Sequence, residues 1–226
     1  MNASTNKDKY GEVLTPPFLV QQMIDDLKTK GLEEVSLALS NAHKVFEPGA
    51  GQGVFFDVFV NQNDYFNIKE TETFKYMLNE INYEHFDNLQ EVCKNYKQHT
   101  EIILSNCLDV SSERCDLVIG NLPFNCHTKK FVPSLAKNHK HDESVTKSKS
   151  VTLWNKITHF CFERMLKPGG YFYAIIPCIW LKPDRGGIYD LFTKHHDIIL
   201  LKTLVRFNSC SPVEHTGMDG SLHLSR

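Results

Sequence analysis

The sequence predicts an α/β fold in which a mostly parallel sheet carries helices on both faces. Short apolar runs alternate along the chain with stretches whose apolar residues recur at helical spacing. Each run is nearly continuous in apolar residues, as expected of a strand that is buried on both faces of a parallel sheet. A turn with three glycines at alternate positions, residues 49–53, follows the first run. The 226 residues are enough for one domain of this class.

The expected elements follow one another in a regular order. The first is a helix that begins at Thr15-Pro16-Pro17, where we expect the threonine hydroxyl to cap the helix and the prolines to occupy its first turn. It ends near Lys28. The expected strands are 45–46, 74–80, 101–104, 116–119, 171–176 and 198–207, and the expected helices between them are 54–60, 86–96 and 154–165. This alternation predicts parallel pairing, because helical crossovers join the strands.

Composition and charge argue against several classes of protein. The sequence has no apolar run that could span a bilayer, and its first ten residues lack the apolar core of a signal peptide. We therefore expect a cytoplasmic, intracellular protein with no membrane partner. The seven cysteines are scattered, odd in number and without a C-x-x-C pair, which indicates reduced thiols and no metal site. The net charge of −2 gives no global attraction to nucleic acid, so any such surface must be local.

The glycine turn predicts a nucleotide-binding site. Glycines allow the ligand to approach the backbone there, because a Cβ atom would hold it away. Glu47-Pro48 precede the turn, and an acid, Glu80, closes the next expected strand. A carboxylate at that strand end can accept hydrogen bonds from both ribose hydroxyls of an adenosine group. A solvated strand end is the plain alternative for Glu80.

A second candidate site follows the strand expected at 116–119. There the chain reads Asn121-Leu122-Pro123-Phe124, which places an amide, a rigid turn and an aromatic ring at one edge of the sheet. These groups can hold a planar amine against an electrophile. Alone, the four residues are equally compatible with a simple exit from a strand. Their position after the glycine turn is what favours a catalytic role.

Together these segments resemble the N6 adenine-specific DNA methyltransferases, which use S-adenosylmethionine. The segments Tyr10 to Pro17, Glu47 to Phe55 and Asn121 to Phe124 are each similar to a motif of that family. The resemblance runs from about residue 10 to about residue 207 and implies a Rossmann-like class I methyltransferase fold. It implies a cofactor site made of Tyr10, Thr15, Glu47, Pro48, Gly49, Gly51, Gly53, Phe55, Glu80, Asn106 and Asn121. The catalytic residues that it implies are Asn121, Leu122, Pro123 and Phe124.

The resemblance also implies a mechanism. The Asn121 amide oxygen and the Leu122 carbonyl accept the two hydrogens of the adenine N6 amine. Phe124 stacks on the base, which has been rotated out of the DNA duplex, and the methyl group is transferred in one in-line displacement. Trp180, just past an expected strand, is a candidate for the wall of the base pocket and equally a candidate for the core.

Two departures from the family pattern leave alternatives open. The family usually has an acidic residue after the third strand; here Asn106 is the preferred match for contacting the cofactor adenine, and Asp109 is the alternative. Leu122, at the second position of the catalytic segment, is more typical of ribosomal RNA adenine dimethylases. RNA is therefore the rival substrate, while the opening segment favours DNA.

Two polar regions complete the expectation. Residues 125–150 hold six lysines, and this lysine-rich insert either follows phosphates or consists of solvated side chains. Residues 208–226 are expected to be a polar tail after a catalytic domain at 1–207, which leaves the last strand pair of the fold incomplete, as in a C-terminally truncated member. No target-recognition domain is recognisable. A separate specificity subunit, or a chain that binds the cofactor without catalysis, is therefore an alternative to an independent enzyme of DNA methylation or restriction-modification.

Overall fold

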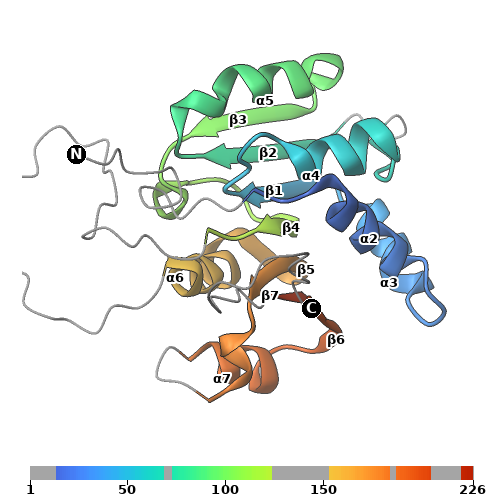
Figure 1. Ribbon diagram of the computed structural model, residues 1–226, viewed down its shortest axis with the longest axis vertical. Helices are drawn as coiled ribbons and strands as arrows, with labels where there is room; N and C mark the ends of the chain where they lie inside the picture. Colours follow the sequence, from blue (N-terminus) through green and yellow to red (C-terminus); the bar gives the residue numbers. More distant parts are fainter. Residues whose placement is uncertain (1–13, 69–72, 124–152, 184–186, 205–219, 226) are drawn as a thin grey trace, which may run out of the picture.

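The structure, a computed structural model, describes residues 14–68, 73–123, 153–183, 187–204 and 220–225. Its centre is a seven-stranded sheet with the strand order β3-β2-β1-β4-β5-β7-β6 (Figure 1). Strands β3, β2, β1, β4 and β5 pair in parallel, and β7 pairs antiparallel with both β5 and β6. Because β1 lies between β2 and β4, the strand order reverses there, and such a switch point is where ligands bind in sheets of this kind.

The elements have the following bounds. The strands are β1 (Lys44–Pro48), β2 (Lys75–Glu80), β3 (Thr100–Leu104), β4 (Cys115–Asn121), β5 (Leu166–Pro177), β6 (Ile198–Leu204) and β7 (Gly220–Ser225). The α-helices are α2 (Pro17–Leu27), α3 (Glu33–Ser40), α4 (Val54–Phe56), α5 (Phe86–Val92), α6 (Leu153–Phe160) and α7 (Ile188–Lys194). Two π-helical segments, η1 (Asp57–Gln62) and η6 (Cys161–Met165), continue α4 and α6. Short 3-10 turns are η3 (Tyr83–His85), η4 (Lys94–Tyr96), η5 (Cys107–Asp109) and η7 (Cys178–Leu181).

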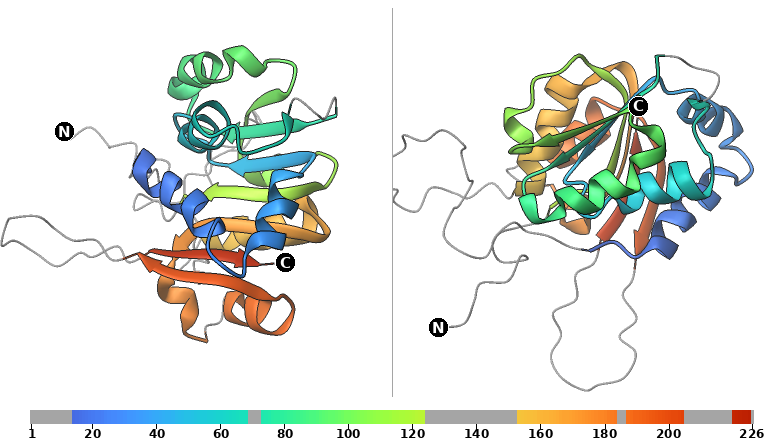
Figure 2. Two further views of the ribbon diagram at one scale, coloured as in Figure 1. Left: turned by 90° about the vertical axis from the view of Figure 1, so that its right-hand side faces the viewer. Right: turned by 90° about the horizontal axis from the view of Figure 1, so that it is seen from above.

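The sheet separates two hydrophobic cores, because successive side chains of a strand point to opposite faces. Along β4, Leu117 and Ile119 enter one core and Val118 enters the other. The first core packs against α2, α3, α4, η1 and α5, and the second packs against α6 and α7. Figure 2 shows these two groups of helices on opposite sides of the sheet. Burial on both faces is the physical reason for the nearly continuous apolar runs, and the predicted fold class is confirmed.

The first helix follows its predicted pattern but not its predicted cap. The residues at helical spacing, Val20, Met23, Ile24 and Leu27, are all buried on one face of α2. The N-cap residue is Pro16, in extended conformation, and no side chain caps the helix. Thr15 stands one residue earlier, and its hydroxyl accepts a hydrogen bond from another part of the chain. The expected threonine cap is therefore wrong.

The expectation of an incomplete final strand pair is also wrong. Strand β7 lies in the region predicted as a polar tail, and it pairs with β5 from Phe172↔Ser225 to Pro177↔Gly220. A domain boundary at residue 207 leaves this strand out. Its sequence, Gly-Ser-Leu-His-Leu-Ser, has only two apolar residues, at alternate positions, so it lacks the continuous apolar run by which the parallel strands were recognised.

Two short helices, α3 and α7, were not expected from the sequence. Each buries little apolar surface: Leu39 alone in α3, and Ile188 and Phe192 in α7. The periodic signal of such short helices is weak. Among the helices that the structure describes, none is long and apolar enough to cross a membrane.

Candidate active site

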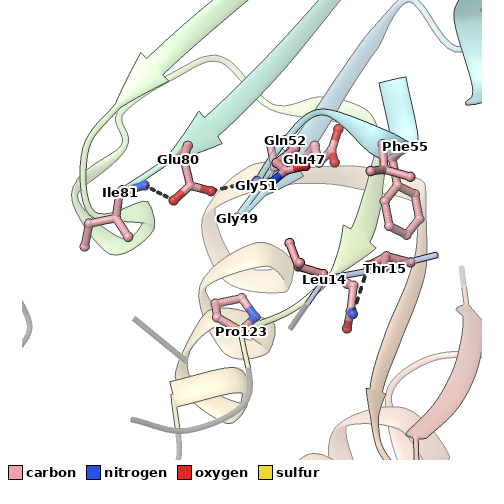
Figure 3. Close-up of a pocket in the computed structure, with 13 residues that line it drawn as sticks. Leu14, Thr15, Glu47, Gly49, Gly51, Gln52, Phe55, Glu80, Ile81 and Pro123 are labelled. Atoms are coloured by element: carbon pink, nitrogen blue, oxygen red, sulfur yellow. Dashed lines mark hydrogen bonds between the residues drawn. The ribbon is translucent and has the colours of Figure 1, made fainter. Parts of the chain in front are cut away.

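A pocket opens at the carboxyl ends of β1, β2 and β4, where the strand order reverses (Figure 3). Its walls come from the segment before α2, the glycine turn after β1, the end of β2 and the end of β4. The lining residues are Leu14, Thr15, Glu47, Gly49, Ala50, Gly51, Gln52, Val54, Phe55, Glu80, Ile81, Asn121 and Pro123. The two motifs that the sequence analysis treated separately therefore meet in one pocket.

The neighbouring strand β2 holds the glycine turn in place. The peptide N–H groups of Gly49 and Ala50 donate to the carbonyl oxygen of Asn79, at 2.9 and 2.8 Å. Gly51 has a φ of +55°, and a Cβ atom added there would have no neighbour within 4 Å. Such a backbone conformation favours glycine. The turn thus leaves its backbone at Gly51 open to a ligand.

Gly53 has a different role. Its φ is +82°, and a Cβ atom there would lie 3.1 Å from Leu89 Cδ2 of α5. Gly53 does not line the pocket. It allows the start of α4 to pack closely on α5, so its place in the motif reflects helix packing.

Glu80 ties the end of β2 to the glycine turn. Its Oε2 accepts from the Gly51 N–H at 2.7 Å, and its Oε1 accepts from the Ile81 N–H at 2.8 Å (Figure 3). The same Oε1 also accepts from the Asn82 N–H at 2.7 Å. The residue is 5% exposed. A carboxylate has about four acceptor positions, so these three bonds leave capacity for a hydroxyl donor from a ligand.

Glu47 is the second carboxyl group of the pocket and is almost fully buried. The Tyr76 hydroxyl donates to its Oε2 at 2.9 Å. Burial raises the pKa of the Glu47 carboxyl from 4.5 to about 8; the Tyr76 bond lowers this pKa, and the negative charge of Glu80 raises it. Glu47 therefore carries its proton at neutral pH, and a cation placed beside it would favour release of that proton.

Asn121, the last residue of β4, brings an amide group to the pocket. Its Nδ2 donates to the Thr15 hydroxyl oxygen at 3.0 Å. The next residue, Leu122, is fully buried, and its N–H donates to the Ile175 carbonyl at 3.2 Å. Pro123 lines the pocket, and its Cδ lies 3.2 Å from the place of a Cβ atom on Gly49. The end of β4 with Pro123 and the glycine turn are therefore in close contact.

Not every predicted site residue lies in the pocket wall. Pro48 and Gly53 belong to the motif but do not line the pocket. Asn106 does not line it either; its side-chain oxygen accepts from the Leu108 N–H and caps η5. Tyr10 and Phe124 lie outside the described residues. Trp180 is 1% exposed and packs edge-on against Phe192, 5.0 Å between ring centroids, so it belongs to the core.

Several residues that shape the pocket were not predicted from the sequence. Asn79 holds the glycine turn through its carbonyl oxygen, and its side-chain amide donates to the carbonyl oxygens of Ile103 in β3 and of Ser105 just after it. A backbone contact of this kind has no sequence signal. Ile81 and Gln52 line the pocket, and their positions next to Glu80 and Gly51 were the signal that could have identified them.

The described wall of the pocket carries acidic side chains and no basic ones. Its described lining includes two glutamates and no lysine, arginine or histidine. Across the part of the chain that the structure describes, no group of three or more histidine, cysteine, aspartate or glutamate side chains could hold a metal ion. Any ligand of the described wall would meet carboxyl groups, backbone N–H groups and neutral side chains.

Comparison with solved structures agrees on one architecture. A modification subunit assigned to a type I restriction enzyme of Vibrio vulnificus aligns with a TM-score of 0.63 at 16% identity, over 96% of this chain and 45% of that protein. A protein assigned as a class I S-adenosylmethionine-dependent methyltransferase, from Listeria monocytogenes, aligns with a TM-score of 0.62 at 14% identity, over 95% and 61%. The fold is that of the class I methyltransferases.

A third methyltransferase-fold structure, assigned as an RNA methyltransferase from Pyrococcus horikoshii, aligns with a TM-score of 0.59 at 17% identity. It covers 95% of this chain and 86% of that protein. The chain thus spans most of the Pyrococcus protein but less than two thirds of the other two. No family model matches the sequence, and no curated protein matches it. At such identities the shared property is the methyltransferase fold.

Proposed function

We propose that this chain transfers a methyl group from S-adenosylmethionine to the N6 amine of adenine in DNA. The observation that carries the proposal is the shared pocket, because Asn121 lines the same pocket as the glycine turn and Glu80. An amine held at Asn121 and an adenosine group held at Glu80 would then be neighbours. Transfer between bound groups benefits from such fixed proximity.

The residues present fit S-adenosylmethionine. Gly51 leaves backbone open to the ligand, Glu80 has acceptor capacity for ribose hydroxyls, and the buried Glu47 carboxyl suits a cationic ammonium group. When bound, this cofactor supplies an electrophilic methyl group on a sulfonium centre. The Glu80 carboxylate matches the hydroxyl-rich portion of this cofactor, and the Glu47 carboxyl group matches its cationic portion.

The chain's own residues would act on the substrate by accepting hydrogen bonds. The N6 amine of adenine is a weak nucleophile, because its lone pair is delocalised into the ring. Asn121 Oδ1 and the Leu122 carbonyl would accept its two hydrogens and concentrate electron density on the nitrogen without prior deprotonation. Leu122 is suited to this by its position: its buried side chain and its N–H bond to Ile175 fix the backbone at the turn.

RNA is the second candidate substrate. Leu122 stands where ribosomal RNA adenine dimethylases commonly have an aliphatic residue, and the Pyrococcus protein assigned as an RNA methyltransferase shares this fold. DNA remains our proposal because the opening segment resembles the DNA enzymes and because two type I restriction modification proteins align over 96% of the chain. By the same analogy, a separate specificity subunit is the partner that we propose to select the target site.

The test is transfer of a radiolabelled methyl group to duplex DNA, single-stranded DNA and ribosomal RNA, followed by digestion to nucleosides. We expect N6-methyldeoxyadenosine. A ribonucleoside product would support the RNA candidate, and cofactor binding without transfer to any substrate would point to a non-catalytic subunit.

A variant test addresses the catalytic assignment. Asn121→Ala should reduce transfer by at least about a thousandfold, because it removes an acceptor that acts on the reacting amine, while the cofactor Kd changes by less than about threefold. Asn88→Ala, at an exposed position of α5, is the matched control. Retained transfer in Asn121→Ala would exclude this residue as the amine acceptor.

A further inference from the structure

The Glu47 side chain lies in the pocket wall between β2 and β4. On the β2 side, its Oε2 accepts the Tyr76 hydroxyl at 2.9 Å. On the β4 side, its stem passes beside Gly120, since a Cβ atom on Gly120 would lie 3.5 Å from Glu47 Cγ. Glu47 is 1% exposed, and it lines the pocket. A ligand in the pocket therefore meets this carboxyl group beside β4, next to the residue that precedes Asn121.

The two carboxyl groups of the pocket differ in what surrounds them. Figure 3 shows Glu80 and Glu47 on either side of Gly51. Glu80 accepts three backbone N–H groups, which together can hold an anion. Glu47 accepts one neutral hydroxyl, and the described lining holds no lysine, arginine or histidine. A buried carboxyl group with so little compensation for a negative charge keeps its proton.

The titratable groups around Glu47 do not supply a positive charge. Tyr76 and Glu80 belong to β2, and Cys93 follows α5. Burial raises the pKa of Cys93 to about 12 and the pKa of Tyr76 well above its usual value, so both groups stay neutral. The negative charge of Glu80 favours the protonated form of Glu47. Among the described groups none can ionise Glu47, so the positive charge that would do so has to come from a ligand.

The proposed cofactor carries such a charge at the matching end. Its methyl group has to reach an amine beside Asn121, at the end of β4, whereas Glu80, at the end of β2, suits the ribose. The methionine portion is bonded to the same sulfur as the methyl group, so its ammonium group would lie on the β4 side, with Glu47. An ammonium ion and a carboxylate together carry no net charge, and such a pair can occupy a buried site that a lone carboxylate cannot.

We propose that Glu47 recognises the ammonium group of the cofactor by releasing its own proton in exchange. On binding, the O–H bond of the Glu47 carboxyl group breaks, the proton passes to the solvent, and the carboxylate pairs with the ammonium group. No other bond changes, and the net charge of the site stays the same. This inference rests on the proposed function and deepens it, because affinity then depends on pH and on a cationic amino group in the ligand.

Calorimetric titration of the full chain in two buffers of different ionisation enthalpy counts the released protons without catalysis. S-adenosylhomocysteine carries the ammonium group, and 5′-methylthioadenosine is the matched ligand that keeps adenosine and sulfur but lacks the amino-acid portion. At about pH 7 we expect about 0.9 proton per S-adenosylhomocysteine, which is the fraction of Glu47 that is protonated when its pKa is about 8, and none for 5′-methylthioadenosine. Equal release with both ligands would overturn the proposal, because the proton would then come from another group.

The same titrations over a range of pH test the residue. The Kd of S-adenosylhomocysteine for the wild type should fall about fiftyfold between about pH 6 and pH 8, because proton release becomes more favourable as pH rises. In Glu47→Gln, which has no proton to release, the Kd should be nearly independent of pH. Glu34→Gln, at an exposed position of α3, is the matched control and should follow the wild type. A constant ratio between the Kd values of Glu47→Gln and the wild type across this range would contradict the exchange.

A second variant tests the hydroxyl donor. The Tyr76 hydrogen bond lowers the pKa of Glu47, because it favours the charged form. Tyr76→Phe should therefore weaken binding of S-adenosylhomocysteine at about pH 7 by at least about fivefold, while the Kd of 5′-methylthioadenosine stays within about twofold of the wild type. Wild-type affinity for S-adenosylhomocysteine in Tyr76→Phe would mean that no charged Glu47 forms in the complex, and the proposal would be wrong.

Failure of the proposed function has a different signature. If S-adenosylhomocysteine binds with release of the Glu47 proton but neither DNA nor RNA is methylated, the recognition role stands and the substrate assignment fails. If it binds without release of a proton, the cofactor assignment stands and this proposal fails. If neither ligand binds, the cofactor assignment fails and this proposal fails with it.

Discussion

Replacement of Glu47 by glutamine should stabilise the protein at neutral pH. The Glu47 carboxyl is 1% exposed, and its pKa is raised to about 8 from 4.5, mainly by burial. Between these two pH values the folded chain keeps a proton that the unfolded chain releases. The free energy of unfolding therefore falls as pH rises through this range, because the folded state binds more protons than the unfolded state. Glutamine is neutral throughout and keeps an oxygen for the Tyr76 hydroxyl.

The size of the effect follows from the distance between the pKa values. Each pH unit above 4.5 lowers the free energy of unfolding of the wild type by about 1.36 kcal/mol, until the pH approaches the pKa of Glu47 in the folded state. From 4.5 to 7 this amounts to about 3 kcal/mol, which Glu47→Gln should recover at pH 7. The gain should vanish near pH 4.5 and reach its largest value above about pH 8.

Urea unfolding of the wild type and Glu47→Gln at several pH values between about 4.5 and 8.5 measures this difference. Glu34→Gln, at an exposed position of α3, is the matched control and should follow the wild type. If the wild-type and Glu47→Gln stabilities run parallel across the range, the carboxyl is not held protonated by burial and the reasoning is wrong.

Three further changes test other parts of the site. Gly53→Ala should lower the free energy of unfolding by about 1–3 kcal/mol, because its new Cβ meets Leu89. Gly51→Ala should lower it by about 1 kcal/mol and should mainly weaken cofactor binding. Urea unfolding and calorimetric titration measure the two effects, and equal behaviour of the two variants would refute the different roles of Gly51 and Gly53. Glu80→Gln should weaken binding of S-adenosylhomocysteine by at least about tenfold, because an NH2 group replaces one of the two oxygens that accept backbone N–H groups. An unchanged Kd would count against a role of Glu80 in cofactor binding. Trp180→Ala should lower stability by about 3–5 kcal/mol, as expected of a buried aromatic residue; a stable variant with altered substrate affinity would instead return Trp180 to the base pocket.

Much of the fold could be read from the sequence because burial on both faces leaves a strong signal. The parallel strands contain buried apolar runs, such as 76–78 in β2 and 117–119 in β4, and α2 has a clear apolar stripe at Val20, Met23, Ile24 and Leu27. Strand β7 escaped because an antiparallel strand with two leucines among polar residues gives no such signal. Its place is set by pairing with β5 and β6, which are distant in sequence.

The candidate site shows the same division between local and distant information. Gly49, Gly51, Glu80 and Asn121 were proposed from local motifs, and they share one pocket. The contacts that set their geometry are not local. The carbonyl of Asn79 under the glycine turn, and the bond from Asn121 to Thr15, depend on chain segments brought together only by folding.

Residues of one sequence motif can differ in their structural role. Gly51 and Gly53 look alike in the sequence, yet Gly51 faces the pocket and Gly53 faces α5. Trp180 and its neighbour Ile179 differ in the same way: Trp180 is buried and Ile179 is 63% exposed. A 3-10 turn sends successive side chains in different directions, and its pitch cannot be read from two residues.

The position of β7 has a consequence for how the protein is made. It is the last described strand along the chain, yet it lies between β5 and β6, and β6 pairs with the sheet only through it. During synthesis, β6 leaves the ribosome before its partner exists, and the edge of β5 stays unpaired until residues 220–225 emerge. An unpaired edge is a template for association with other chains. The sheet can therefore be completed only after the six residues of β7 have been synthesised, and until then the nascent chain keeps an edge that favours association.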